Sequence, residues 1–139
     1  MNEKYVIEKH FWLTPPKQYA EYDKEFHFDF DPCPYPKPQN FNSLHIAWGK
    51  SNYVNPPFRR KDGGGFGPTA WVRKAISENK QGKQVVLLLP TQSYVNLLLE
   101  AGAELRSAGR TKWVSGKTGE RCKSPSPTTL FILRAKPEV

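Results

Sequence analysis

The chain has 139 residues, of which 37% are hydrophobic and 13% aromatic, and 21 Lys and Arg against 13 Asp and Glu give a formal net charge of +8. These values fit one domain over residues 1–139 and exclude a disordered chain; no apolar run approaches the roughly 20 residues of a membrane helix, so we expect a cytoplasmic domain without membrane contact. The positive charge favours a polyanionic partner, nucleic acid before membrane, with a merely soluble basic protein as the alternative.

The first predicted element is a strand over residues 26–31, where apolar and polar residues alternate strictly. The alternation places Phe26, Phe28 and Phe30 on one face of this strand. Pro32 ends it, because proline cannot continue a sheet ladder, and four prolines between positions 32 and 38 predict an extended loop.

The rest of the chain alternates between strand and helix patterns. The predicted elements are a strand at Ser51–Val54, a helix capped by Thr69 and ending near Gly82, a buried strand over residues 84–89, a helix near residues 94–108, and a C-terminal β-hairpin of residues 111–114 with Thr128–Leu133. Strands alternating with helices predict an α/β sheet with a central parallel part.

Asn55-Pro56-Pro57-Phe58 is the most informative motif. It follows a predicted strand, and its two prolines fix the backbone and remove two N–H donors, which leaves nearby carbonyls as acceptors. The Asn55 side chain adds another acceptor, and Phe58 offers a flat face. Such a group suits a planar ligand with an exocyclic amine, such as adenine N6 or cytosine N4; a plain strand-terminating turn is the alternative.

Asn55-Pro56-Pro57-Phe58 resembles the [D/N/S]PP[Y/F] signature of amino-group methyltransferases that use S-adenosylmethionine, and most of the chain resembles the small phage-type DNA N6-adenine methyltransferase (Dam) family. The other matching segments are Trp12-Leu13-Thr14-Pro15-Pro16, Phe28-Asp29-Phe30-Asp31-Pro32-Cys33, Trp71-Val72, Val85-Val86-Leu87-Leu88-Leu89-Pro90 and Gly109-Arg110-Thr111-Lys112-Trp113. The resemblance implies a small Rossmann-like methyltransferase sheet without a separate target-recognition domain.

The resemblance also implies roles for individual residues. Asn55, Pro56, Pro57 and Phe58 would hold the target base, and the methyl donor S-adenosylmethionine would be bound by Trp12, Thr14, Pro15, Asp31, Pro32 and Cys33. Asp31 would lie beside the donor because open α/β sheets bind ligands at the carboxyl ends of their strands. Larger relatives carry a glycine-rich turn after the first strand, and this chain has none there.

Cations next to the motif predict the DNA contact. Arg59, Arg60 and Lys61 follow Phe58 directly and could hold the phosphates that flank an extruded nucleotide; a solvated basic loop is the alternative. Arg110 and Lys112 are further candidates for DNA binding. His27, Asp29, Asp31 and Cys33 alternate as metal ligands could, but they mix hard and soft donors without a second cluster, so we expect no metal.

The resemblance therefore implies an adenine-specific, site-specific DNA methyltransferase that acts in the cytoplasm of a bacterial host, with DNA as its partner and no obligatory protein partner. Two alternatives stay open. One is the same chemistry on cytosine N4 or RNA adenine, and the other is a catalytically silent nucleic-acid-binding module, which would have no need to bind the methyl donor.

Overall fold

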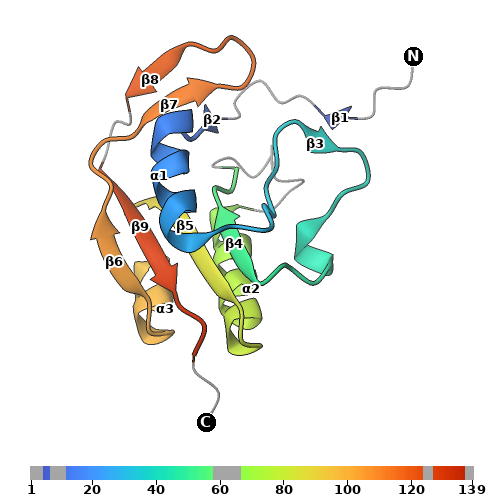
Figure 1. Cartoon of the computed structure of the whole chain (residues 1–139), viewed down its shortest axis with the longest axis vertical. Coiled ribbons are helices and arrows are strands. Elements are labelled where there is room, and N and C mark those ends of the chain that lie inside the picture. Colours follow the sequence, from blue (N-terminus) through green and yellow to red (C-terminus); the bar gives the residue numbers. More distant parts are fainter. Residues whose placement is uncertain (1–4, 7–11, 58–66, 124–126, 137–139) are drawn as a thin grey trace.

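The computed structural model describes residues 5–6, 12–57, 67–123 and 127–136. Within these ranges the chain has a mixed α/β fold (Figure 1). The elements are β1 (Tyr5–Val6), β2 (Trp12–Leu13), α1 (Pro16–Phe26), β3 (Lys37–Pro38), the 3-10 turn η1 (Ser43–His45), β4 (Ser51–Val54), α2 (Pro68–Lys80), β5 (Gln84–Pro90), α3 (Val95–Glu100), β6 (Glu104–Ser107), β7 (Lys112–Ser115), β8 (Arg121–Lys123) and β9 (Thr128–Leu133). None of the helices in the described ranges is long and apolar enough to cross a membrane.

The main sheet consists of strands in the order β4-β5-β9-β6. β4 and β5 are parallel, which confirms the expected parallel part, and β9 is antiparallel to both of its neighbours. Beside β4, Phe30 forms an isolated parallel bridge to Asn52. A small sheet has the order β2-β7-β8, and β1 pairs with β3.

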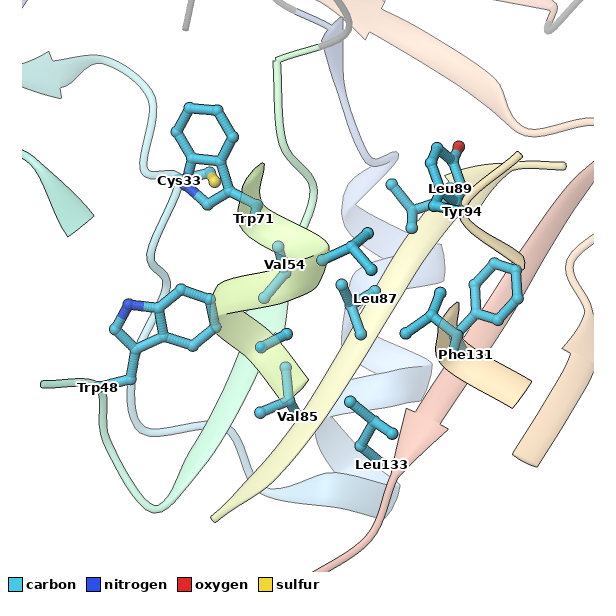
Figure 2. Packing of buried hydrophobic residues seen from close by; sticks show 13 residues of the cluster. Cys33, Trp48, Val54, Trp71, Val85, Leu87, Leu89, Tyr94, Phe131 and Leu133 are labelled. Carbon is cyan, nitrogen blue, oxygen red and sulfur yellow. The ribbon is translucent and has the colours of Figure 1, made fainter. Parts of the chain in front are cut away.

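The main sheet has a hydrophobic core on each face, because α1 covers one face and α2 and α3 cover the other (Figure 1). The first core lies between the sheet and α2 and α3, and Figure 2 shows its side chains meeting there. Its buried members include Val54, Trp71, Val72, Val85, Leu87, Leu89, Leu98, Phe131 and Leu133. The second core, on the α1 side, includes Phe26, Tyr53, Val86, Leu88, Leu130 and Ile132. A central strand covered on both faces explains the unbroken apolar run of β5.

Helix α2 confirms the predicted helix but not its predicted cap. It begins at Pro68, whose fixed φ suits the first turn, after an extended Gly67 at the N-cap position. Thr69 lies inside that first turn, and no side chain caps the helix. Trp71, Val72 and Ala75 recur at helical spacing and are buried against the sheet.

Hydrogen bonds hold the segment before Asp31 beside β4. The Asp29 backbone N–H donates to the Ser51 carbonyl oxygen at 2.8 Å, and the Tyr53 N–H donates to the Phe30 carbonyl oxygen at 3.1 Å. The Ser51 hydroxyl donates to the carbonyl oxygen of Phe26 at 2.8 Å and so ties the end of α1 to β4. The residues that follow this segment and those that follow β4 therefore lie at the same edge of the sheet.

Gly49 packs closely against this segment, and we expect Gly49→Ala to destabilise the fold. An added Cβ would lie 2.2 Å from Oδ1 of Asp29 and 2.8 Å from Cβ of Phe30. Overpacking of this kind lowers the free energy of unfolding by roughly 1–3 kcal/mol. Urea denaturation measures the loss, and the exposed neighbour Lys50, changed to Ala, serves as a control that should stay within about 0.5 kcal/mol of wild type. A Gly49→Ala protein as stable as wild type would contradict this packing.

The predicted strand over residues 26–31 is wrong except at Phe30. Phe26 instead ends α1, and His27 terminates the helix in the left-handed conformation, with a φ of 51°. Because the strand geometry is absent, the three phenylalanines do not share a face. Phe26 and Phe28 pack in the second core, whereas Phe30 packs against the first.

Two predictions for the second half of the chain are also wrong. The helix expected near residues 94–108 is only α3, because Gly102, at a φ of 88°, turns the chain into strand β6. The expected hairpin of residues 111–114 with β9 does not form. β7 pairs with β2 and β8 in the small sheet, while β9 enters the main sheet between β5 and β6. The β2–β7 pairing and the insertion of β9 beside β5 join strands that are distant in the sequence, whereas β7 and β8 form a local hairpin.

Candidate active site

A pocket of about 200 Å³ lies where Phe30 and β4 end. The chain at Phe30 is parallel to β4. Asp31 follows Phe30 and Asn55 follows β4, so both residues lie at the same edge of the sheet. This is the edge at which open α/β sheets bind ligands. The lining residues are Leu13, Thr14, Tyr19, Asp31, Cys33, Tyr35, Tyr53 and Asn55.

Asn55 lines this pocket, and its side chain carries a buried acceptor without a partner in the described residues. Its residue is only 7% exposed, and its Nδ2 donates to the backbone carbonyl oxygen of Trp12 at 2.9 Å. Because a carbonyl oxygen can only accept, this bond fixes which end of the amide carries the oxygen. The buried Oδ1 has no hydrogen-bond partner within the described residues. An unsatisfied buried acceptor costs about 1–3 kcal/mol, so Oδ1 is poised for a donor on a ligand.

Asp31 gives the pocket its negative charge. Its Oδ1 accepts the backbone N–H of Cys33 at 2.8 Å, which fixes the carboxylate at the end of the strand. The residue is open to solvent at the pocket, yet protein atoms crowd the carboxyl group. The resulting desolvation, partly offset by the Cys33 N–H, raises the pKa of Asp31 to about 6. The carboxyl group is therefore mostly ionised at neutral pH.

Neutral aromatic and polar side chains form the rest of the wall. The Tyr53 hydroxyl is hydrogen-bonded to Oγ1 of Thr14, and burial raises the pKa of Tyr53. The Tyr19 ring meets the Tyr53 ring edge-on, with centroids 5.0 Å apart. Burial, and next the charge of Asp31, also raise the pKa of the Cys33 thiol, so it stays protonated. Asp31 is the charged member of the lining, and no Lys or Arg from the described ranges lines this pocket.

Comparison with known proteins decides the family. The sequence model of the family described as DNA N-6-adenine-methyltransferase (Dam) matches residues 3–138. The chain belongs to the Dam family. A curated relative, the DNA N-6-adenine-methyltransferase of Escherichia phage T1, is 28% identical over 118 residues, a match that covers 69% of this chain and 47% of that protein. The chain thus spans about half the length of this relative. The resemblance that the motifs indicated is confirmed.

The structure brings together some of the residues that the Dam resemblance singled out. Thr14, Asp31, Cys33 and Asn55 all line the pocket. Trp12 contributes its carbonyl oxygen to Asn55, while its ring packs against the second core. The four prolines at these motifs frame the pocket without lining it: Pro15, Pro32 and Pro56 are buried, and Pro57 is half-buried.

Several predicted contacts with DNA cannot be located in this structure. Phe58, Arg59, Arg60 and Lys61 lie outside the described residues, so their roles stay predictions. Arg110 and Lys112 are exposed, just before and at the start of β7, and they do not line the pocket. In the described ranges, no group of three or more His, Cys, Asp or Glu residues is arranged to hold a metal ion.

Sequence reasoning missed the aromatic part of this Dam-family pocket. Tyr53 stands two residues before Asn55, and the alternation along β4 could have placed both on one face of the strand. Tyr19 belongs to α1, a helix that was not predicted. Leu13 and Tyr35 lie in short or irregular segments and carry no local signal.

Proposed function

We propose that this chain transfers a methyl group from S-adenosylmethionine to the N6 amino group of adenine in DNA, on a Rossmann-like sheet. The observation that carries the proposal is the buried Oδ1 of Asn55, which has no hydrogen-bond partner among the described residues and belongs to a residue that lines the same pocket as Asp31. The parallel placement of Phe30, β4 and β5, with α2 between β4 and β5 in the chain, supports the choice of sheet.

The charge of the pocket suits the methyl donor. When bound, S-adenosylmethionine supplies an electrophilic methyl group on a positively charged sulfonium. The pocket is lined by Asp31 and by Tyr19, Tyr35 and Tyr53, and both carboxylates and tyrosine rings attract cations. Thr14 has a further lone pair for an amine or hydroxyl donor, because its one hydroxyl can serve Tyr53 and a ligand together.

Asn55 is the proposed contact of the target base. Its Oδ1 accepts an amino hydrogen of adenine, and the bond from Nδ2 to the Trp12 carbonyl oxygen keeps the amide from turning. As the amine is methylated, positive charge develops on its nitrogen, and a fixed acceptor stabilises that charge more in the transition state than in the ground state. The negative charge of Asp31 acts in the same direction. The extra proton of the methylated amine is acidic and leaves to solvent, so no strong base is required.

Two further parts of the proposal rest on the motifs alone. Phe58 provides the ring on which the extruded adenine stacks, and the carbonyl oxygen of Pro56 is a second acceptor for the amine. Duplex DNA requires extrusion of the adenine, at a cost of a few kcal/mol that stacking offsets in part.

Product analysis tests the proposed reaction. The chain is incubated with S-adenosylmethionine and duplex DNA, the DNA is digested to nucleosides, and methylated nucleosides are identified by mass. We expect N6-methyldeoxyadenosine, and parallel reactions with RNA or with duplexes lacking adenine should give no product. If the product is a methylated cytosine nucleoside, or if only RNA is methylated, the substrate is cytosine or RNA and not adenine in DNA. A chain that binds DNA but not the donor in calorimetry would be a binding module and not an enzyme.

A further inference from the structure

The hairpin of β7 and β8 lies beside β2, near the end of the molecule where β2 leads into α1 (Figure 1). β2 pairs with β7, with Trp12 opposite Ser115 and Leu13 opposite Val114. Leu13 also lines the pocket, and Trp12 holds the Asn55 amide. The strand that supplies these contacts is therefore hydrogen-bonded to the hairpin.

The hairpin carries positive charge that the described structure leaves unneutralised. Arg110, Lys112, Lys117 and Arg121 are exposed, and within residues 109–123 the sequence has one acid, Glu120. Val114 is paired with Arg121, and Lys112 lies two residues before Val114, so the side chains of Lys112 and Arg121 lie on the same face of the hairpin. Trp113 points to the opposite face and is buried, which makes the face with the two cations the outer one. None of the four cations makes an ion pair with a residue of the described ranges.

Another pair of arginines provides a contrast on the same molecule. Arg106 pairs with Glu25 at 2.7 Å, and Arg134 pairs with Glu104 at 3.1 Å, near the far end of α1. These cations are already neutralised by carboxylates. The hairpin cations, by contrast, are exposed and have no such carboxylate partner among the described residues.

One aromatic contact connects the hairpin to the pocket wall. The ring of Tyr35, which lines the pocket, lies so close to Gly116 in the hairpin turn that a Cβ there would be 2.6 Å from Cε1. Only glycine permits this approach. A shift of the turn toward the pocket therefore displaces the Tyr35 ring, and a shift of the ring toward the turn displaces Gly116.

We propose that the β7–β8 hairpin is an arm that contacts the DNA backbone, and that the Tyr35 ring against Gly116 couples DNA binding by this arm to ligand binding in the pocket. The inference rests on the proposed function, because it takes DNA as the polyanion. A two-stranded ribbon with cations on its outer face can follow a groove of duplex DNA and pair with its phosphates.

The first test measures the affinity of the chain for a fluorescent duplex as a function of salt, without donor. Replacing Lys112 and Arg121 together with Ser should weaken binding at least about tenfold at low salt and lower the salt slope by about 1.8, or about 0.9 for each phosphate that the hairpin no longer neutralises. The matched control replaces Arg106 and Arg134 with Ser, which removes the same charge from the neutralised pair. The control should keep the wild-type slope. If both double variants have the same DNA affinity and the same salt slope, the proposal that the hairpin contacts the DNA backbone is wrong.

The second test measures coupling, with S-adenosylhomocysteine as the probe so that no turnover occurs. In wild type, the dissociation constant of the probe should change several-fold when duplex DNA saturates the chain, since coupling between two sites commonly lies in the range of about 5–150-fold. The ratio of the two dissociation constants of the probe, without and with DNA, is the measure of coupling. Gly116→Ala, which pushes the ring away, and Tyr35→Ala, which removes it, should each bring this ratio close to one. Gly116→Ala should have no additional effect in the Tyr35→Ala background, and circular dichroism checks that each variant is folded. A ratio of one in wild type, or an unchanged ratio in Tyr35→Ala, would overturn the coupling.

These outcomes are separable from failure of the proposed function. A wild-type chain that produces N6-methyldeoxyadenosine but has the same DNA affinity with and without the hairpin cations refutes the arm alone. A wild-type chain that binds neither duplex DNA nor the probe refutes the proposed function itself.

Discussion

Asn55→Ala is expected to lower the single-turnover rate of methyl transfer by about 10²–10³-fold, the usual effect of removing one preorganised group that stabilises transition-state charge. Donor affinity should change little, because the unpaired Oδ1 is assigned to the amine. Stability should also change little: the variant loses the bond to the Trp12 carbonyl oxygen but no longer buries an unpaired oxygen.

A second buried asparagine provides the matched control. Asn79 is also 7% exposed, and its Nδ2 donates to carbonyl oxygens of Lys83, Leu133 and Arg134, at 2.8, 3.2 and 3.1 Å. Asn79→Ala should lower the melting temperature yet leave the rate of methyl transfer in the folded protein unchanged. If Asn55→Ala keeps more than about a tenth of the wild-type rate, the amine is held by another group.

Asp31→Asn is expected to weaken donor binding while it stabilises the protein at neutral pH. Asn keeps the acceptor for the Cys33 N–H but removes the charge that attracts the sulfonium. The carboxyl of Asp31 has a pKa of about 6 in the folded chain, above its ordinary value of 3.8. The folded state therefore retains a proton that the unfolded state has lost, and this contribution to stability disappears as the pH rises through about 6.

Two pH profiles check this expectation. The melting temperature of Asp31→Asn should exceed that of wild type at pH 7, and the difference should vanish near pH 4. The affinity of wild type for S-adenosylmethionine should fall as the pH drops below about 6, whereas the variant should bind weakly at every pH. Asp29→Asn removes the same charge from a residue outside the pocket lining and should keep most of the donor affinity. A variant that binds the donor like wild type would make Asp31 a turn residue only.

The parts of the fold that local patterns specify could be predicted. The bounds of β4 agree with the prediction, and β5 extends it by Pro90 alone, because prolines at the ends of both segments mark where the strands stop. Helix α1 was missed because Pro15-Pro16 suggests a loop, although proline is also favoured in the first turn of a helix. The position of β9 could not be predicted, since its partners are set by packing across the whole sheet and not by neighbours in sequence.

The predictable part of the site has the same origin. Asn55 follows a strand that was predicted with its observed bounds, and Asp31 closes a predicted strand of which only the bridge at Phe30 forms. Because that bridge is parallel to β4, the two residues still meet at the pocket. The orphaned Oδ1 could not be predicted, because it depends on the Trp12 carbonyl oxygen reaching Asn55 across 43 positions of sequence. Likewise, nothing local to Gly116 indicates that its missing side chain leaves space for Tyr35.

The position of β9 has a consequence for synthesis on the ribosome. β6 pairs only with β9 among the described strands, and β9 fills the gap between β5 and β6. While Thr128–Leu133 remains in the ribosomal exit tunnel, the emerged chain exposes the apolar edge of β5 and leaves β6 without a partner. Unpaired apolar edges promote association between nascent chains. We therefore expect slow translation of the segment between β6 and β9 to increase association between nascent chains and to lower the yield of folded protein.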